Sequence, residues 1–252
     1  MSKRPDDFRF MESVTGSMNG ATALIVLGGE SGSLWKTAIE QINPDVVIGA
    51  NGIVTMINDL DYYVHTENIA NLDRAAKEGD AQAEACMKWT GIDTPKHRLV
   101  HHLSVPFYRN KHNVIPINRN GFNWNKKPDS FSFRAYGLGL ISGDLMKRPE
   151  IIKTLRVGTV GLQCLHLAGI LGCERIYTIG FDLCLGKEHH CYKGVDYKAN
   201  SYWGDNMFAE VNGLKTLWFW VDTAKYLKRI KPEMERQGLY WTDLSGGLFE
   251  VV

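Results

Sequence analysis

The sequence has almost no net charge and no long hydrophobic run. Its 252 residues include 29 lysines and arginines against 28 aspartates and glutamates, which leaves a formal net charge of +1. A chain this close to neutral lacks the electrostatic attraction that draws proteins to nucleic acids and anionic membranes. No apolar stretch approaches the roughly 20 residues that a membrane-spanning helix needs. We therefore predict neither a nucleic-acid partner nor a membrane span.

Cysteine is scarce, and its pattern does not suggest disulfides. The five cysteines are scattered along the chain and odd in number, which does not fit a disulfide framework. The opening MSKRPDDFRF also lacks the apolar segment of a secretory signal. Both observations favour a reducing compartment, and we expect a soluble, cytoplasmic protein.

Two common signatures of ligand sites are missing as well. The glycine-rich turn at 28–33 has the sequence GGESGS, which is neither the GxGxxG fingerprint of NAD-binding proteins nor a Walker P-loop. The cysteines and histidines between 184 and 191 lack the CxxC or HxxxH spacing that zinc sites use. The sequence thus favours neither an NAD-dependent dehydrogenase nor a metal site.

The segment 157–186 contains the clearest structural pattern of the chain. Leucines recur at helical spacing from Leu162 to Leu171 and the pattern stops at Gly172, as buried helices often do at a left-handed residue. A short β-rich run, 176–179, follows and leads to Asp182. The pattern predicts a helix and a parallel strand with an acidic side chain at its carboxyl end, the edge where open α/β sheets bind ligands.

A second unit of the same kind lies near the N-terminus. The apolar run 23–27 leads into the turn 28–33, and a helix is expected from there to about Ile42. A strand, a glycine turn and a helix together can bind phosphate, because glycines permit close backbone approach and the helix N-terminus offers free N–H groups. A plain structural turn explains the glycines equally well. The nucleotide-binding candidates in this turn are Gly28, Gly29, Ser31, Gly32 and Ser33.

Other predicted strands also end in polar residues. The buried run 46–50 stops at Asn51, whose amide could bind a base or a ribose or could simply tolerate the turn. A third strand ends at Glu67, which is a further candidate for nucleotide binding, and a fourth strand is expected over 97–105. The pattern predicts an α/β, Rossmann-like, mostly parallel sheet with helices on both faces.

The remaining segments complete a single predicted domain over 1–252. A polar, asparagine-rich loop at about 106–132 is the expected insertion, and the residues 68–90 are helical by composition. A long amphipathic helix is expected from about 207 to 230, just before Pro232. The chain then closes with a strand and a Ser-Gly-Gly turn at 245–247.

The candidate catalytic residues lie in and just after the central segment. His189 and His190 are the candidate general bases, because a histidine side chain ordinarily titrates near neutral pH, and Asp182 is the acidic candidate. Tyr192 is the last nucleotide-binding candidate, and it begins an aromatic-rich region that would suit either the wall of a ligand pocket or a homo-oligomer interface.

These motifs together resemble the MptE-like (6-hydroxymethylpterin diphosphokinase-like) Rossmann family. They are similar, more distantly, to bacterial sialyltransferases that use CMP-activated sugars. The resemblance rests on GGESGS, on Asn51, on the segment 61–67, on VGTVGLQCLHLAGILGCERIYTIGFDLC at 157–184 and on the closing TDLSGG. It covers about residues 22–67 and 156–186.

The resemblance to sialyltransferases implies a nucleotide near the turn 28–33 and Asn51, with the sugar or pyrophosphate near Thr159 and Gly161. This chain has Gly-Thr-Val-Gly at 158–161 where those enzymes have Thr-Ser-Gly, and it has no histidine after His190. His189 or His190 is therefore the substitute for their general base.

Three hypotheses about function remain open. The first is a nucleotide-sugar-dependent glycosyltransferase, with a CMP-sugar as one candidate donor, a small-molecule or glycan acceptor, and no required cofactor. The second, implied by the diphosphokinase resemblance, is an ATP- and Mg²⁺-dependent pyrophosphoryl transferase acting on a small heterocyclic alcohol, with Glu67 and Asp182 binding the metal. The third is a non-catalytic nucleotide-binding module in which Asp182 only caps a turn.

Overall fold

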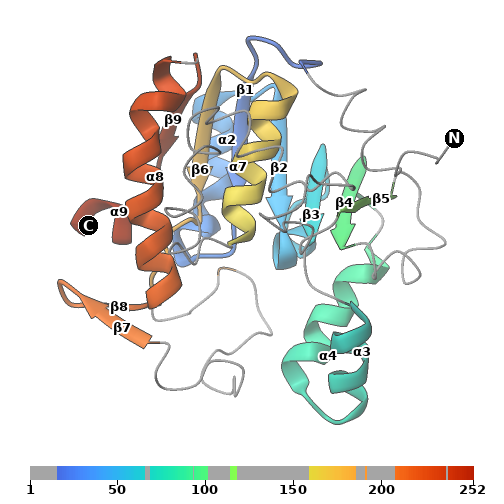
Figure 1. Ribbon diagram of the computed structural model, residues 1–252. Helices are drawn as coiled ribbons and strands as arrows, with labels where there is room; N and C mark the ends of the chain where they lie inside the picture. The colour runs from blue at the N-terminus through green and yellow to red at the C-terminus, as the bar shows by residue number, and fades with distance from the viewer. Residues whose placement is uncertain are drawn as a thin grey trace, which may run out of the picture.

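The computed structural model describes residues 16–65, 69–92, 94–101, 114–117, 159–185, 191, 208–236 and 238–252. These residues form a seven-stranded sheet, a separate two-stranded hairpin, and helices on both faces of the sheet (Figure 1). The strands are β1 (Thr22–Val26), β2 (Val46–Ala50), β3 (Tyr62–His65), β4 (His97–His101), β5 (Val114–Ile117), β6 (Arg175–Ile179), β7 (Phe208–Val211), β8 (Leu214–Leu217) and β9 (Tyr240–Asp243). The α-helices are α2 (Trp35–Ile42), α3 (Ile69–Lys77), α4 (Ala81–Lys88), α7 (Val160–Leu171), α8 (Trp218–Arg236) and α9 (Leu248–Val251). Short 3₁₀ helices are η1 (Glu30–Leu34), η2 (Asn51–Thr55) and η3 (Trp89–Gly91).

The large sheet is parallel throughout the described strands. Its order is β5-β4-β3-β2-β1-β6-β9, so β1 lies between β2 and β6. In the register, Ile25 of β1 lies opposite Ile48 of β2 and Thr178 of β6. The predicted Rossmann-like α/β class is confirmed by this order and by the helices on both faces.

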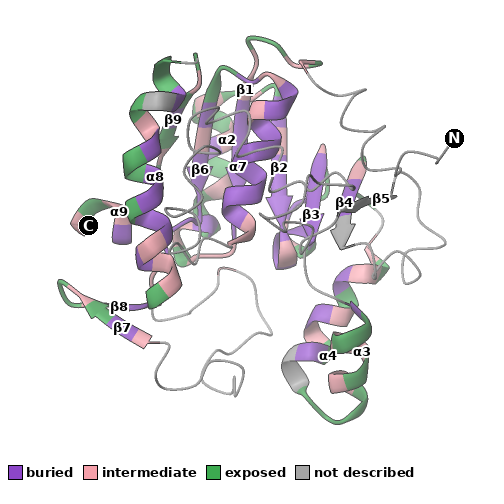
Figure 2. Cartoon of the chain, in the orientation of Figure 1, coloured by how far each residue is buried: buried purple, intermediate pink, exposed green. Residues whose placement is uncertain are grey.

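Each face of the sheet is covered by different helices, which explains the almost continuous apolar runs of its inner strands. Alternate residues of β1 point to opposite sides. Ala23 and Ile25 belong to the core under α7 and α8, whereas Leu24 and Val26 belong to the core on the side of α2 and η2. Figure 2 shows the inner strands and α7 as buried, whereas the α3–α4 pair presents a largely exposed outer side.

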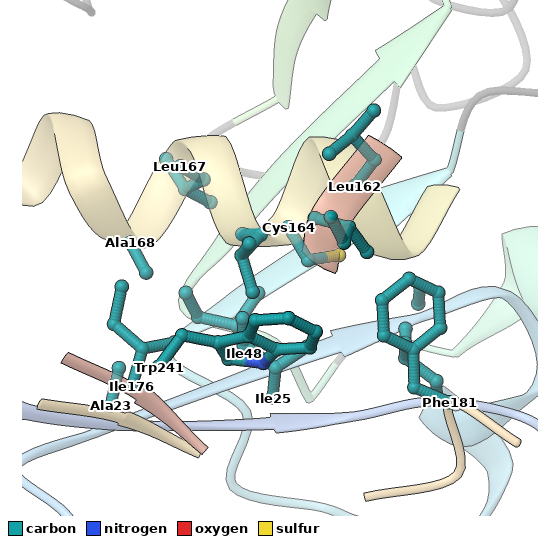
Figure 3. Packing of buried hydrophobic residues seen from close by; sticks show 14 of the residues in the cluster. Ala23, Ile25, Ile48, Leu162, Cys164, Leu167, Ala168, Ile176, Phe181 and Trp241 are labelled. Carbon is teal, nitrogen blue, oxygen red and sulfur yellow. The ribbon is translucent and has the colours of Figure 1, made fainter. Parts of the chain in front are cut away.

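Helix α7 forms where the leucine spacing predicted it. Thr159 caps its start by accepting a hydrogen bond from the Leu162 amide at 3.3 Å, and Gly172 ends it with a φ of 88°. Nearly all of its residues are buried, and Figure 3 shows the helix above the sheet with Trp241 and Phe181 in the space between. Apart from Gln163 and His166 its residues are apolar, as expected for a helix that is buried on nearly all sides.

The helix expected over 207–230 is wrong in its first half. Residues 208–217 form the antiparallel hairpin of β7 and β8, and α8 begins only at Trp218. The turn of the hairpin is Asn212-Gly213, and both residues have positive φ, 49° and 81°. Asn-Gly is the preferred sequence of a two-residue hairpin turn, so local turn chemistry overrode the helical spacing of the leucines. Helix α8 also continues through Pro232 instead of ending before it.

Two further segments differ from expectation. Part of the loop expected at about 106–132 is an edge strand, β5, which contains Pro116; an edge strand can tolerate a residue that donates no backbone hydrogen bond. The helical region expected over 68–90 is two helices, α3 and α4, separated at Gly79 with a φ of 91°. The rest of the loop and the end of the strand expected over 97–105 lie outside the described residues.

No helix in the described parts of the chain is both long enough and apolar enough to cross a bilayer.

Candidate functional site

The strand order creates a switch point between β1 and β6. From β1 the chain proceeds outward on one side of the sheet through β2, β3, β4 and β5, and it then returns to the other side of β1 as β6. In open α/β sheets, ligands bind outside the carboxyl ends of the strands at such a reversal. The candidate site is therefore formed by the segments that follow β1 and β6.

The predicted glycine turn and Asp182 meet at this point. The Asp182 carboxylate accepts hydrogen bonds from the Ser31 amide at 3.1 Å and from the Ser31 hydroxyl. The same hydroxyl accepts a hydrogen bond from the Gly180 amide at 2.9 Å, and the Gly29 amide donates to the Gly180 carbonyl at 2.8 Å. Two segments that lie 149 to 151 positions apart in the sequence are thus joined by a compact polar network.

Asp182 occupies the donors that a phosphate would be expected to use in this turn. Its side chain is buried, and backbone amides of both Glu30 and Ser31 interact with the carboxylate at the start of η1. Burial raises the pKa of Asp182, while the hydrogen bonds from Ser31 partly offset this effect. The amides at 30 and 31 are therefore already paired with an anion that belongs to the protein.

The glycines of the turn are required for close packing. A Cβ on Gly29 would lie 2.7 Å from the Gly180 carbonyl oxygen and would also overlap Asp182. A Cβ on Gly32 would lie 2.9 Å from the Cys191 sulfur and would overlap the Leu27 carbonyl. At both positions the absence of a side chain lets one backbone segment approach another, independently of any ligand.

The other candidates in the turn have smaller roles in this network. The Gly28 carbonyl accepts a hydrogen bond from the Cys191 amide at 3.0 Å. The Ser33 hydroxyl donates to the Glu30 carbonyl at 2.8 Å, which is a contact within the turn itself. Gly28 therefore contacts Cys191 beyond β6, whereas the hydrogen bond described for Ser33 stays within the turn.

Asn51 lies where the sequence places it, directly after β2. Its φ is 52°, which supports the interpretation that asparagine tolerates this turn. Its side-chain oxygen, however, is buried and has no hydrogen-bond partner within the described part of the protein. A buried polar atom of this kind is costly unless a ligand or water satisfies it, so the ligand-binding interpretation keeps its support.

The start of α7 lies at the same edge of the sheet. A Cβ on Gly161 would lie 2.6 Å from the Phe181 ring and 2.7 Å from Leu27, the residues that follow β6 and β1. Gly161 therefore allows α7 to approach the ends of both strands. The first turn of α7, with Thr159 at its cap, is directed toward the switch point.

The remaining predicted site residues cannot be placed in this network. Glu67, His189, His190 and Tyr192 lie outside the described residues. Among the described residues, no three His, Cys, Asp or Glu side chains are grouped closely enough to bind a metal ion. Burial raises the pKa of the Cys184 thiol to about 11 and that of the Cys191 thiol to about 12.

A second carboxylate network beside the site has no counterpart among the predicted site residues. Asp243, at the end of β9, accepts hydrogen bonds from the Thr178 hydroxyl at 2.6 Å and from the Ser245 hydroxyl at 2.9 Å. Trp241 Nε1 donates to the Thr178 hydroxyl at 3.0 Å. Burial raises the pKa of Asp243 to about 6. The signal was present in the TDLSGG motif, which places a carboxylate and a serine at the end of a strand.

No protein-family profile matches this chain, and no curated protein matches it either. The family resemblance inferred from the motifs therefore remains a prediction.

Solved structures provide the remaining comparisons. The fold is similar to that of the MAf glycosyltransferase from Magnetospirillum magneticum AMB-1, with a TM-score of 0.50 and 14% sequence identity over 96% of this chain. The match covers 36% of the MAf protein, so this chain spans about a third of its length. A lower TM-score of 0.47, at 14% identity over 89% of this chain and 81% of the other, relates it to the sialyltransferase CstII from Campylobacter jejuni in complex with CMP-3FNeuAc. At such identities the MAf likeness establishes the fold alone, an α/β fold of the kind that a glycosyltransferase contains.

Proposed function

We propose that this chain is a nucleotide-sugar-dependent glycosyltransferase whose donor nucleotide binds at the carboxyl ends of β1, β2 and β6. The observation that carries the proposal is the convergence of separately predicted residues at this edge. The turn 28–33 and Asp182 are in direct contact, Gly161 brings α7 against the ends of β1 and β6, and Asn51 ends the neighbouring strand. The likeness of the fold to the MAf glycosyltransferase adds support for sugar transfer.

We propose that the phosphate of the donor binds at the start of α7 and not in the glycine turn. A second anion at the amides of Glu30 and Ser31 would be repelled by the Asp182 carboxylate that already occupies them. The first turn of α7 offers the alternative, because Thr159 and Gly161 lie at the same edge and N–H groups at a helix start attract anions. The ribose or the base would then lie near Asn51, whose buried oxygen needs a hydrogen-bond donor.

We propose that sugar transfer at this site is direct, without a covalent intermediate on the protein. In the direct form, the acceptor oxygen bonds to the anomeric carbon as the bond from that carbon to the phosphate oxygen breaks. The acceptor proton passes to His189 or His190, and the departing phosphate is stabilised by the amides at the start of α7. CMP-sugars are one candidate class of donor, and a small molecule or a glycan is the proposed acceptor.

The diphosphokinase hypothesis fits the described carboxylates less well. Mg²⁺ prefers carboxylate oxygens as ligands, but Asp182 already accepts hydrogen bonds from Ser31 and Asp243 accepts them from Thr178 and Ser245. A magnesium ion at either group would have to share the carboxylate with these donors, and Glu67, the other carboxylate of that hypothesis, lies outside the described residues. The carboxylate chemistry therefore favours a transfer whose leaving group is stabilised by backbone amides.

A thermal-shift screen tests the proposal. The purified protein is heated with CMP, CDP, UDP, GDP, ADP or ATP, each with EDTA and with Mg²⁺. A ligand at about 100 times its Kd adds roughly 2.7 kcal/mol to the free energy of unfolding, so binding raises Tm measurably. We expect stabilisation by CMP or another donor nucleotide that persists in EDTA. Stabilisation by ATP only with Mg²⁺ would instead support the pyrophosphoryl transferase. If none of the six nucleotides stabilises the protein, the result would favour a structural role for the domain.

A further inference from the structure

We propose that the C-terminal Ser-Gly-Gly turn, residues 245–247, is a positioning element of the ligand site. It fixes the three residues after β6, and these residues in turn fix the glycine turn 28–33 on the other side of the switch point. Ser245 and Asp243 are then positioning residues, which influence the ligand through Gly180, Phe181 and Asp182. The part of this inference that concerns ligand affinity rests on the proposed function.

The first link joins the C-terminal turn to the segment after β6. The Phe181 amide donates a hydrogen bond to the Ser245 hydroxyl at 2.7 Å, and the Leu248 amide donates to the Asp182 carbonyl at 2.9 Å. A Cβ on Gly247 would lie 2.5 Å from the same Asp182 carbonyl oxygen, and Gly247 has a φ of 65°. The turn thus contacts two consecutive residues of the segment through their backbone.

The second link joins that segment to the glycine turn. Gly180 donates to the Ser31 hydroxyl and accepts from the Gly29 amide, and the Asp182 side chain accepts from Ser31. Gly180 therefore contacts the glycine turn and Phe181 contacts the C-terminal turn. Asp182 is hydrogen-bonded on both sides, through its side chain to Ser31 and through its carbonyl to Leu248. A displacement of the segment on one side has to change the hydrogen bonds on the other.

The C-terminal turn has its own anchor in the sheet. The Ser245 hydroxyl donates to Asp243, which also accepts from Thr178 in β6, and the Leu244 amide donates to the Thr178 carbonyl at 2.8 Å. The anchor is supported by the Trp241 indole, which donates to Thr178 from within the core. Ser245 is therefore placed by the sheet, so its hydroxyl is a fixed acceptor for the Phe181 amide.

Amide hydrogen exchange tests the structural link without any ligand. Ser245→Ala removes the acceptor of the Phe181 amide. We expect exchange at Gly29 and Ser31 to accelerate about fivefold, the factor that corresponds to losing one hydrogen bond of ordinary strength. The matched control is Thr223→Val, which removes a buried hydroxyl that donates to the Phe219 carbonyl at 2.7 Å, a hydrogen bond within α8 that involves neither turn. In this control, exchange at Gly29 and Ser31 should change no more than exchange in α7.

The outcome that overturns the link is equally specific. If Ser245→Ala accelerates exchange only at Phe181 and in 245–248, and Gly29 and Ser31 stay protected as in the unaltered protein, the two turns are not coupled. Should Ser245→Ala fail to fold, Ser245→Cys keeps the side-chain volume and weakens the hydrogen bond, and the same amides are compared. Ser245→Thr retains the hydroxyl and should restore protection.

Calorimetric titration with CMP separates this inference from the proposed function. If the unaltered protein binds CMP, Ser245→Ala should raise Kd about fivefold and Thr223→Val should leave it unchanged. An unchanged Kd in Ser245→Ala, despite accelerated exchange at Gly29 and Ser31, would overturn the positioning role. If the unaltered protein binds neither CMP nor any other nucleotide of the screen, the proposed function fails, while the exchange data still decide whether the two turns are coupled.

Discussion

At the scale of single residues, Asp243 makes stability depend on pH. Its pKa is raised from 3.8 to about 6 in the folded protein because its carboxyl group is buried. The folded state then binds a proton that the unfolded state has lost, so the free energy of unfolding falls as pH rises from about 4 to above 6. A difference of about two pH units, at about 1.4 kcal/mol each, gives a cost of about 3 kcal/mol at pH 7.

Asp243→Asn removes this titration while keeping a side-chain oxygen for Thr178 and Ser245. We expect the free energy of unfolding to decline less between pH 5 and pH 7.5 in the variant than in the unaltered protein, as measured by urea denaturation at both values. Asp182, whose pKa is also raised by burial, contributes a decline of the same sign that remains in the variant. An identical pH slope in the two proteins would show that Asp243 titrates normally.

Close packing requires glycine at some positions of this chain but not at others. Gly29→Ala would place a Cβ 2.7 Å from the Gly180 carbonyl oxygen, whereas a Cβ on Gly91 meets no atom within 4 Å. Overpacking of this kind costs about 1–3 kcal/mol, and exposed substitutions usually change stability by less than about 0.5 kcal/mol. Chemical denaturation should therefore show a large loss for Gly29→Ala and almost none for Gly91→Ala; equal losses would contradict the packing account.

At the scale of elements, the β7–β8 hairpin shows where the sequence-based prediction failed and why. Leu214, Leu217 and Val221 recur at helical spacing, but the first two belong to a strand and only the third to α8. The helix predicted over 207–230 is therefore correct for the part that α8 covers, but the prediction placed its start too far toward the N-terminus. The Asn212-Gly213 pair contained the information that separates the two elements, since it favours a turn with positive φ at both positions.

Gly213→Ala tests this explanation of the hairpin. A Cβ at Gly213 meets no atom within 4 Å, so only its φ of 81° opposes the substitution. A side chain in the left-handed region costs roughly 1–2 kcal/mol. We expect a loss of this size in the free energy of unfolding, or a hairpin that opens locally and loses its amide protection. A variant as stable and as protected as the original would show that the turn does not need glycine.

At the scale of the whole molecule, the architecture was more predictable than the site. The buried strands and α7 carry continuous apolar runs or full helical patterns, and these alone indicate a parallel sheet covered on both faces. Strand order gives no comparable signal in the sequence. The contact between Ser31 and Asp182 depends on β1 and β6 being neighbours in the sheet. From the sequence alone, this contact could be expected only because both segments have the pattern of a strand that ends in a turn.

The places of the candidate residues in the fold were predictable, but their contacts were not. The glycine turn, Asn51, Gly161 and Asp182 all lie at the predicted edge of the sheet. Which donors Asp182 would occupy depends on contacts across 151 positions of the sequence, and no local pattern encodes them. The same applies to Asp243 and Ser245. Asp243 is hydrogen-bonded to Thr178 in β6, and Ser245 is hydrogen-bonded to Phe181 just after β6.

The most direct test of a ligand site at this edge is an NMR titration of the ¹⁵N-labelled protein with CMP. We predict that the largest amide shift changes occur at Asn51, at Gly161 and in the turn 28–33, with α3 and the C-terminal half of α8 unaffected. The α3 amides serve as the internal control, since this helix is separated from the β1–β6 switch point by the strands β2 and β3. Saturable changes confined to α3 and α4, or to α8, would place the ligand elsewhere and contradict the account.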